Sequence, residues 1–175
     1  MPLNKEEETR PKGLSLHTQA PLINTVDIFS NPVNLSNLIQ NHNAVLIDFF
    51  RGTWWSYWKE ELENLTKKFH EFEKRNVKVI SIASDTIGLL RKFKEENKFP
   101  IDMISDRGAK IAKDYNVYWF TEGWGKLKVK QAVPSKFLID KNGTIIWKYI
   151  GRDKTDRPSV SAMLLLIDKY IKNPN

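Results

Sequence analysis

The sequence contains no cysteine in 175 residues. Disulfide bonds, thiolate metal ligands and thiol-based catalysis are therefore excluded for this chain. Its three histidines, His17, His42 and His70, are scattered and lack the spacing of metal ligands. We expect no metal and no cofactor. No apolar run approaches the ~20 residues that a membrane-spanning helix needs, so we expect no membrane partner.

Charge is spread along the whole chain. The formal net charge is +7, which favours encounters with acidic partners. Positive and negative residues alternate along the expected helices, which is typical of solvated faces. Residues 1–13 are polar and lack the apolar segment of a secretory signal, so we expect a flexible arm and a cytoplasmic protein. Residues 14–175 are predicted to form one domain.

Apolar periodicity predicts an α/β fold. Residues Ala44 to Phe50 are nearly all apolar and favour a strand buried on both faces. From Ser56 to Arg75 apolar residues step by three and four, which indicates a helix. A strand over 77–83 and a helix over 86–97 follow, with Leu89, Leu90 and Phe93 expected to face inward. Further elements are expected at 100–104 (strand), 108–115 (helix), 135–149 (hairpin) and 159–171 (helix, with Tyr170 inward).

Two other stretches stand out. Residues 22–35 alternate around a Ser-Asn-Pro turn, which predicts a short hairpin and then a helix at 36–40. The segment Tyr118 to Gln131 holds Trp119 and Trp124, followed by lysines that alternate with apolar residues. It fits a lysine-bearing edge strand or a long loop.

The turn after the first buried strand is crowded with aromatic residues. Trp54, Trp55, Tyr57 and Trp58 follow Gly52, where a strand is expected to feed a helix N-terminus. Backbone N–H groups and the helix dipole favour anions and thiolates at such a position. Trp58 lies on the apolar stripe of the helix, so it is predicted to belong to the core.

Five segments, in matching order and spacing, link the chain to a known family: residues 20–21, 50–54 with 61–62, 105–106 with 115–117, 133–143, and 151–153 with 156–159. On these segments the chain resembles the peroxiredoxin-like proteins of the AhpC/TSA (redoxin) family. The resemblance implies a thioredoxin-like, three-layer α/β/α sandwich with a mixed central sheet. It also implies self-association.

The resemblance fails where the family carries its cysteines. In a Cys-x-x-Cys alignment, Trp55 and Trp58 occupy the two cysteine positions. In the broader peroxiredoxin alignment, Trp58 replaces the peroxidatic cysteine and Arg51 replaces a proline. Either way no nucleophile is left, so thiol peroxidase activity is predicted to be absent. The resemblance also implies a cis bond before Pro134. The former active-site positions are Thr53, Trp54, Trp55, Ser56, Tyr57, Trp58, Val133 and Pro134.

Three functional hypotheses follow. The first is a protein that binds a protein partner or itself, with Trp55, Tyr57, Trp119 and Trp124 as contact residues, although the same rings also suit a hydrophobic core. The second is an oxidoreductase as in the family at large, or an enzyme whose non-thiol chemistry uses Thr53, Ser56, Tyr57 and Arg51. The third is a basic protein that binds nucleic acid or acidic partners, with the lysine strip beside Trp119 and Trp124 as the nucleic-acid surface.

Charged residues near the turn have two interpretations as well. Arg51 and Arg152 are either surface or ion-paired residues, or they hold an anion in the former pocket. Glu60, Glu61 and Glu63 are expected to complement the helix dipole and to face solvent.

Overall fold

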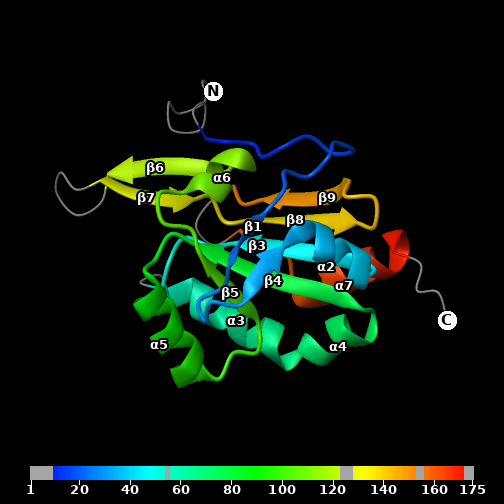
Figure 1. Ribbon diagram of the computed structural model, residues 1–175, viewed down its shortest axis with the longest axis horizontal. Coiled ribbons are helices and arrows are strands. Elements are labelled where there is room, and N and C mark those ends of the chain that lie inside the picture. The colour runs from blue at the N-terminus through cyan, green and yellow to red at the C-terminus, as the bar shows by residue number, and fades with distance from the viewer. Residues whose placement is uncertain (1–9, 54–55, 123–127, 153–155, 172–175) are drawn as a thin grey trace.

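The fold is built around a mixed five-stranded sheet. The computed structural model describes residues 10–53, 56–122, 128–152 and 156–171. The strand order is β5-β4-β3-β8-β9, with β3, β4 and β5 parallel and β8 and β9 antiparallel (Figure 1). The mixed sheet predicted from the sequence is therefore confirmed. The strands are β3 (Ala44–Phe49), β4 (Val77–Ala83), β5 (Asp102–Ser105), β8 (Ser135–Asp140) and β9 (Ile145–Ile150).

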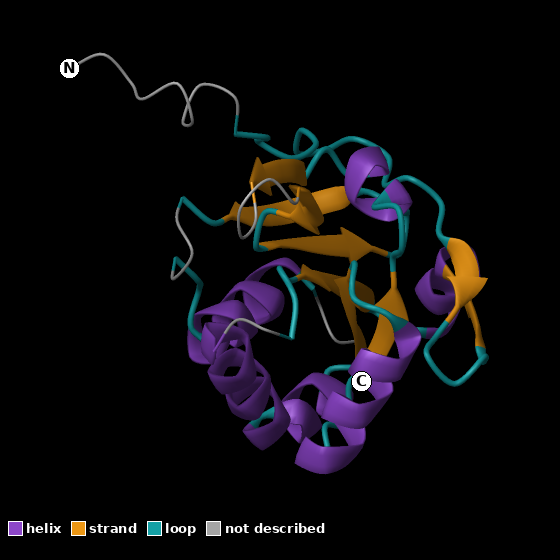
Figure 2. Ribbon diagram, turned by 90° about the vertical axis from the view of Figure 1, so that its left-hand side faces the viewer, coloured by secondary structure: helices purple, strands orange, loops and turns teal. Residues whose placement is uncertain are grey.

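Helices cover both faces of this sheet and make three layers (Figure 2). All six residues of the central strand β3 are buried, as its continuous apolar run predicts. Ala44 and Leu46 point into one core, and Val45, Ile47 and Phe49 point into the other. The first core is closed by α3 (Ser56–Lys67), α4 (Phe69–Lys74), α5 (Ile87–Asn97) and α7 (Val160–Tyr170), and the second by α2 (Leu35–Asn41) and α6 (Lys110–Asp114).

The prediction of a single helix from Ser56 to Arg75 is wrong, because this stretch forms two helices, α3 and α4. The chain leaves helical geometry at Lys68, where φ is −109° and ψ is 9°. The backbone N–H of Lys68 donates to the carbonyl of Leu65, three residues back, in a tighter turn than an α-helix makes. The apolar stripe continues through Phe69 and Phe72 across this break, so its period cannot reveal the break.

Two residues predicted to face inward are exposed instead. Leu89 in α5 and Tyr170 in α7 lie at the surface, whereas Leu90, Met163 and Ile167 are buried as expected. The Thr86 hydroxyl caps α5 by accepting from the backbone of Leu89. Leu90 packs in the core, and because successive residues of a helix turn by about 100°, its neighbour Leu89 points away from it.

The predicted hairpins are present. Strands β1 (Asn24–Val26) and β2 (Pro32–Asn34) pair antiparallel. Between β8 and β9, the Asp140 side chain accepts hydrogen bonds from the backbone N–H groups of Asn142 and Thr144. Gly143 adopts a φ of 77°, a backbone conformation that residues with a Cβ atom disfavour. The stretch from 118 to 131 forms β6 (Tyr118–Glu122) and β7 (Lys128–Ala132), an antiparallel pair outside the main sheet.

The chain before β1 is tied to the edge of the domain. The backbone N–H of Gly13 donates to the carbonyl of Asn116 over 3.0 Å. The ammonium of Lys148 in β9 donates to the carbonyls of Lys12 and Leu14. Residues 12–14 are therefore held beside β9 and the residue pair that precedes β6.

Candidate functional site

The aromatic turn leads into a helix with two different faces. Trp54 and Trp55 lie outside the described residues, as does the side chain of Ser56, the first residue of α3. Trp58 is fully buried at 0% exposure. Its ring stacks on Phe50, with centroids 4.5 Å apart, and lies 4.0 Å from the centroid of Phe93. The core position predicted for Trp58 is confirmed.

The opposite face of α3 is open. Tyr57 is 45% exposed and lies one residue from buried Trp58, because successive residues of a helix turn by about 100°. The preceding turn is anchored to the chain after β4, where the backbone N–H of Thr53 donates to a carboxylate oxygen of Asp85 over 2.6 Å. The anchor fixes where α3 begins, and so which of its residues reach solvent.

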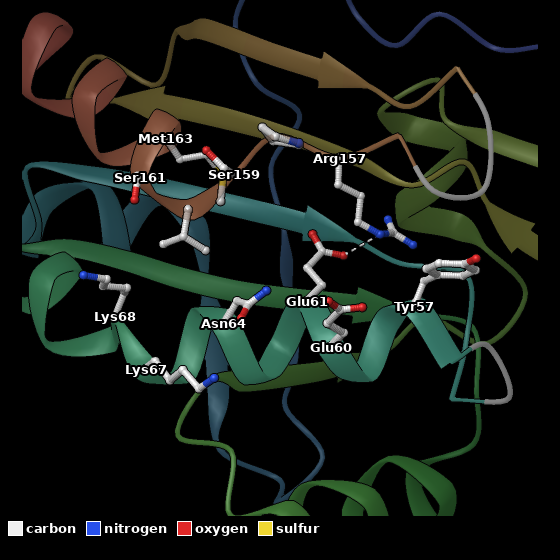
Figure 3. Close-up of a pocket in the computed structure, with 12 residues that line it drawn as sticks. Tyr57, Glu60, Glu61, Asn64, Lys67, Lys68, Arg157, Ser159, Ser161 and Met163 are labelled. Carbon is white, nitrogen blue, oxygen red and sulfur yellow. Dashed lines mark ion pairs between the residues drawn. The ribbon is translucent and has the colours of Figure 1, made fainter.

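A pocket of about 470 Å³ lies between the open face of α3 and the start of α7 (Figure 3). Residues of α3 that recur every three or four positions form one wall, and the segment before α7 with its first turn forms the other. Ser159 caps α7 by accepting from the backbone of Ala162. Thr53 is not among the lining residues. These are Tyr57, Glu60, Glu61, Asn64, Lys67, Lys68, Arg157, Pro158, Ser159, Val160, Ser161 and Met163.

A buried charge network, which consists of Asp48, Lys136, Glu61 and Arg157, lies beneath this pocket. The ammonium of Lys136 in β8 contacts Asp48 Oδ1 in β3 at 2.5 Å and also pairs with Glu61 in α3. The Nε atom of Arg157 lies 3.0 Å from the other oxygen of Glu61 (Figure 3). Ser81 donates to the second oxygen of Asp48. The network therefore joins two strands of the sheet, α3 and the pocket wall.

Burial and ion pairing shift the pKa values of Glu61 and Lys136 in opposite directions. Burial raises the pKa of Glu61, and the positive charges of Lys136 and Arg157 oppose this effect. Burial alone lowers the pKa of Lys136, but Asp48 and Glu61 outweigh it and raise that pKa. Lys136 is thus held as an ammonium between two carboxylates. A buried charge needs such partners, since leaving it unpaired costs several kcal/mol.

The sequence-based expectation for Glu61 was wrong. Glu61 is buried and ion-paired, so it does not face solvent. It also lies more than one turn into α3, beyond the first turn where a carboxylate would complement the helix dipole. Glu60 and Glu63 are exposed as expected. The signal that could have identified the network is a charge inside each of two apolar strands. Asp48 and Lys136 stand directly opposite each other in the β3–β8 register.

The two arginines predicted as anion ligands occupy different settings. Arg51 follows β3 and is only 7% exposed, and its Nε donates to Oε1 of buried Gln131 over 3.0 Å. Burial, and then the charges of Arg10 and Arg157, lower the pKa of Arg51. The side chain of Arg152 is 89% exposed and pairs with Asp156. Only Arg51 is therefore brought to the former active site.

Trp119, Val133 and Pro134 lie in or directly after the β6–β7 pair, which contacts Arg51 through Gln131. Val133 and Pro134 follow β7 directly, and the bond between them is trans, so the expected cis bond was wrong. Proline lowers the cost of a cis bond without requiring one. Trp119 is half-buried and lies opposite Gln131 in the β6–β7 pair. Trp124 lies outside the described residues.

The described ranges hold neither a metal-ligand cluster nor a membrane-spanning helix. In residues 10–53, 56–122, 128–152 and 156–171, no three His, Asp or Glu side chains cluster as metal ligands would. No helix in those ranges is long and apolar enough to cross a membrane.

Residues 16–148 match the AhpC/TSA family. A thiol-disulfide oxidoreductase ResA of Bacillus cereus is 23% identical over 145 residues, which are 82% of this chain and 75% of that protein. Chloroplastic peroxiredoxin Q of Oryza sativa subsp. japonica is 28% identical over 120 residues, which are 63% of this chain and 52% of that protein. The chain thus spans about half of the rice relative.

Solved structures resemble this fold closely despite low identity. Peroxidoxin BcpB from Mycobacterium tuberculosis superimposes with a TM-score of 0.78 at 18% identity, over 91% of this chain and 99% of that one. A mutant of peroxiredoxin 6 of Arenicola marina gives a TM-score of 0.79 at 16% identity, over 89% of this chain and 73% of that one. At such identities the likeness concerns the fold alone, and the predicted peroxiredoxin-type thioredoxin fold is confirmed.

Proposed function

The chain belongs to the AhpC/TSA family, and from that premise we propose that it acts by binding a ligand or partner rather than by thiol chemistry. The observation that carries this proposal is Trp58, which fills the position of a family cysteine and is buried between Phe50 and Phe93. An indole has one N–H donor and cannot take the place of a thiolate nucleophile. The position is occupied by core packing, so the redox role of the site is lost.

The pocket between α3 and α7 is the proposed contact region. It combines an exposed aromatic ring, Tyr57, with apolar walls from Val160 and Met163 and with polar groups such as Asn64. Concave sites with a few convergent polar groups and perturbed pKa values are the usual places for ligands. The buried charge network beneath it keeps the walls in register. Self-association, a cytoplasmic location and non-thiol enzyme chemistry stay predictions.

A peroxide-consumption assay tests whether the protein has any peroxidase activity. Hydrogen peroxide and an alkyl hydroperoxide are each supplied with dithiothreitol, and separately with thioredoxin and its reductase. We expect the rate with this protein to equal the buffer rate, while a cysteine-containing peroxiredoxin run alongside is active. Turnover well above the buffer rate would refute the proposal, because it would require a reactive group other than a thiol.

Paired variants test the contact region. Asn64→Arg places a long side chain in the pocket, and Lys92→Glu changes an exposed residue on α5, away from it. We expect partners isolated at native expression with the unaltered chain to be lost with Asn64→Arg and kept with Lys92→Glu. Circular dichroism establishes that both variants are folded. Equal loss or equal retention in the two variants would remove the pocket from the proposal.

A further inference from the structure

Three charged side chains on the α3 wall of the pocket have no partner within the described part of the chain. They are Glu60, Lys67 and Lys68, which line the pocket and are exposed. The other charged residues that line the pocket, Glu61 and Arg157, pair with each other. The charges that remain for a ligand on this wall are therefore one negative and two positive.

The acidic residues nearest to the two lysines along the chain do not neutralise them. Glu71 follows Lys68 by three residues, but it pairs with basic residues of α4 and of the C-terminal end of that helix. Glu63 precedes Lys67 by four residues on the same helix, and no ion pair joins these two among the described side chains. Both lysines are therefore available to a negatively charged group of a ligand.

The two kinds of charge lie at opposite ends of the pocket. Figure 3 shows Tyr57 and Glu60 towards one end of α3, Lys67 and Lys68 at the other, and Asn64 between them. These residues recur at intervals of three or four, so they share one face of the helix. Seven residues separate Glu60 from Lys67, which places them about 10 Å apart along the helix axis. The wall thus presents a negative and a positive group at a defined spacing.

The surface between these ends is largely apolar. Pro158, Val160 and Met163 line the pocket from the segment before α7 and from its first turn. The Tyr57 ring is 45% exposed and lies one turn before Glu60, so a cation that pairs with Glu60 can also contact the face of the ring. An extended chain advances about 3.3 Å per residue, so three residue steps span the same ~10 Å.

We propose that the pocket binds an extended peptide segment of a partner protein that carries a basic residue and, three positions away, an acidic residue. The basic side chain pairs with Glu60 beside the Tyr57 ring, and the acidic one pairs with Lys67 and Lys68. An apolar side chain between them packs on the wall from α7. A nucleic-acid strand fits less well, because its uniformly negative backbone would face Glu60. The inference rests on the proposed binding function and deepens it by naming the chemistry of the partner.

Nuclear magnetic resonance titration of the ¹⁵N-labelled full chain tests the proposal with two blocked peptides of equal composition. The first, acetyl-Ala-Arg-Ala-Leu-Asp-Ala-amide, has its charges three positions apart. The second, acetyl-Ala-Ala-Leu-Arg-Asp-Ala-amide, has them adjacent, so it reaches only one end of the pocket at a time. We expect saturable amide shifts at residues that line the pocket, and an affinity about threefold to tenfold lower for the second peptide.

Charge reversals on α3 test which residues make the contacts. Glu60→Lys and Lys67→Glu should each weaken binding of the first peptide by about threefold to tenfold. Glu63→Lys reverses an exposed charge on the same helix outside the pocket and should change the affinity less than about twofold. A peptide with Glu in place of Arg should regain affinity for Glu60→Lys, which a general loss of structure would not produce. Circular dichroism establishes that the variants are folded.

Each other outcome is decisive. Absence of saturable shifts at the pocket, equal affinities of the two peptides for the unaltered chain, or equal effects of Glu60→Lys and Glu63→Lys would overturn the proposal. A single-stranded oligonucleotide that binds the same residues more tightly than the first peptide would also overturn it. If Asn64→Arg loses the isolated partners while the peptides leave the pocket unoccupied, only this inference fails. If the first peptide binds as expected while Asn64→Arg keeps every partner, only the proposed contact region fails.

Discussion

Replacing Trp58 tests whether the family's cysteine position has become part of the core. The indole is fully buried and packs against Phe50, Phe93 and Phe99. Trp58→Ala removes this contact area and leaves a cavity that the surrounding rings can fill only in part. Such truncations cost about 3–5 kcal/mol of unfolding free energy. Since a domain of this size is stable by about 5–15 kcal/mol, the variant should be severely destabilised.

Two further variants separate packing from other effects. The Nε1 atom of Trp58 has no hydrogen-bond partner among the described residues. Trp58→Phe therefore removes a buried, unsatisfied donor and keeps an aromatic ring, so the loss of volume is partly offset and should cost less than about 1.5 kcal/mol. Tyr57→Ala changes the adjacent but half-exposed residue and should cost less than about 1 kcal/mol.

Urea denaturation followed by far-ultraviolet circular dichroism measures all three variants without relying on tryptophan fluorescence. We expect Trp58→Ala to be the most destabilised variant. Trp58→Phe should be destabilised less, and Tyr57→Ala no more than Trp58→Phe, with similar m-values for all three. A cost below about 1 kcal/mol for Trp58→Ala, or a cost equal to that of Tyr57→Ala, would refute the reasoning. It would mean that the ring is not packed, and that the site is open for chemistry or for a ligand.

Three further predictions concern the buried charge network, a surface ion pair and a glycine of α5. Lys136→Met removes the ammonium that pairs with buried Asp48, while Glu61 keeps Arg157, and it should cost about 3–5 kcal/mol; adding Asp48→Asn should recover part of that loss in a double-mutant cycle. The hydrogen bonds from Arg75 lower the pKa of Asp168, so this pair stabilises the fold above the unfolded pKa of the carboxyl and loses its effect as pH falls through the folded value. Because Asp168 is about half exposed, Asp168→Asn should cost less than about 1 kcal/mol at pH 7 in urea denaturation, and nothing near pH 2. Gly88→Ala places a methyl group in open space on α5 and should raise the thermal midpoint, by about 0.5–1 kcal/mol of stability; a lower midpoint would contradict it.

The elements that the sequence predicts well are those whose signal is local. The apolar run in β3 and the Asn-Gly turn after Asp140 depend on neighbouring residues, and the structure confirms both. The burial of Trp58 is also predictable from local sequence, because Trp58 lies on the apolar stripe of its helix. The break at Lys68 is not predictable in this way, because the apolar stripe continues across it. The orientation of Leu89 is not predictable either, because Leu89 and Leu90 are adjacent apolar residues and only packing decides which of them is buried.

The charges beneath the site could not be placed from the sequence because their partners are distant in the chain. Asp48 and Lys136 are separated by 88 residues, and Lys136 and Glu61 by 75. Only the β3–β8 register brings the first pair together, and only the rotation of α3 brings Glu61 to Lys136. A charged residue within an apolar strand therefore indicates a buried charge, but the sequence does not reveal which residue pairs with it. Arg10 shows the same limitation, since its neighbour Trp119 is distant in sequence.

The buried charge network also bears on why the pocket keeps its shape. A buried ion pair contributes little net stability compared with apolar residues of similar size, so stability alone is a weak reason for it. Its geometry offers a stronger one. Lys136 fixes Glu61 on α3, and Glu61 fixes Arg157 on the opposite wall, so one chain of contacts spans the pocket floor from the sheet to α7. An apolar replacement could preserve the fold, but it could not orient Arg157 at the wall of the pocket.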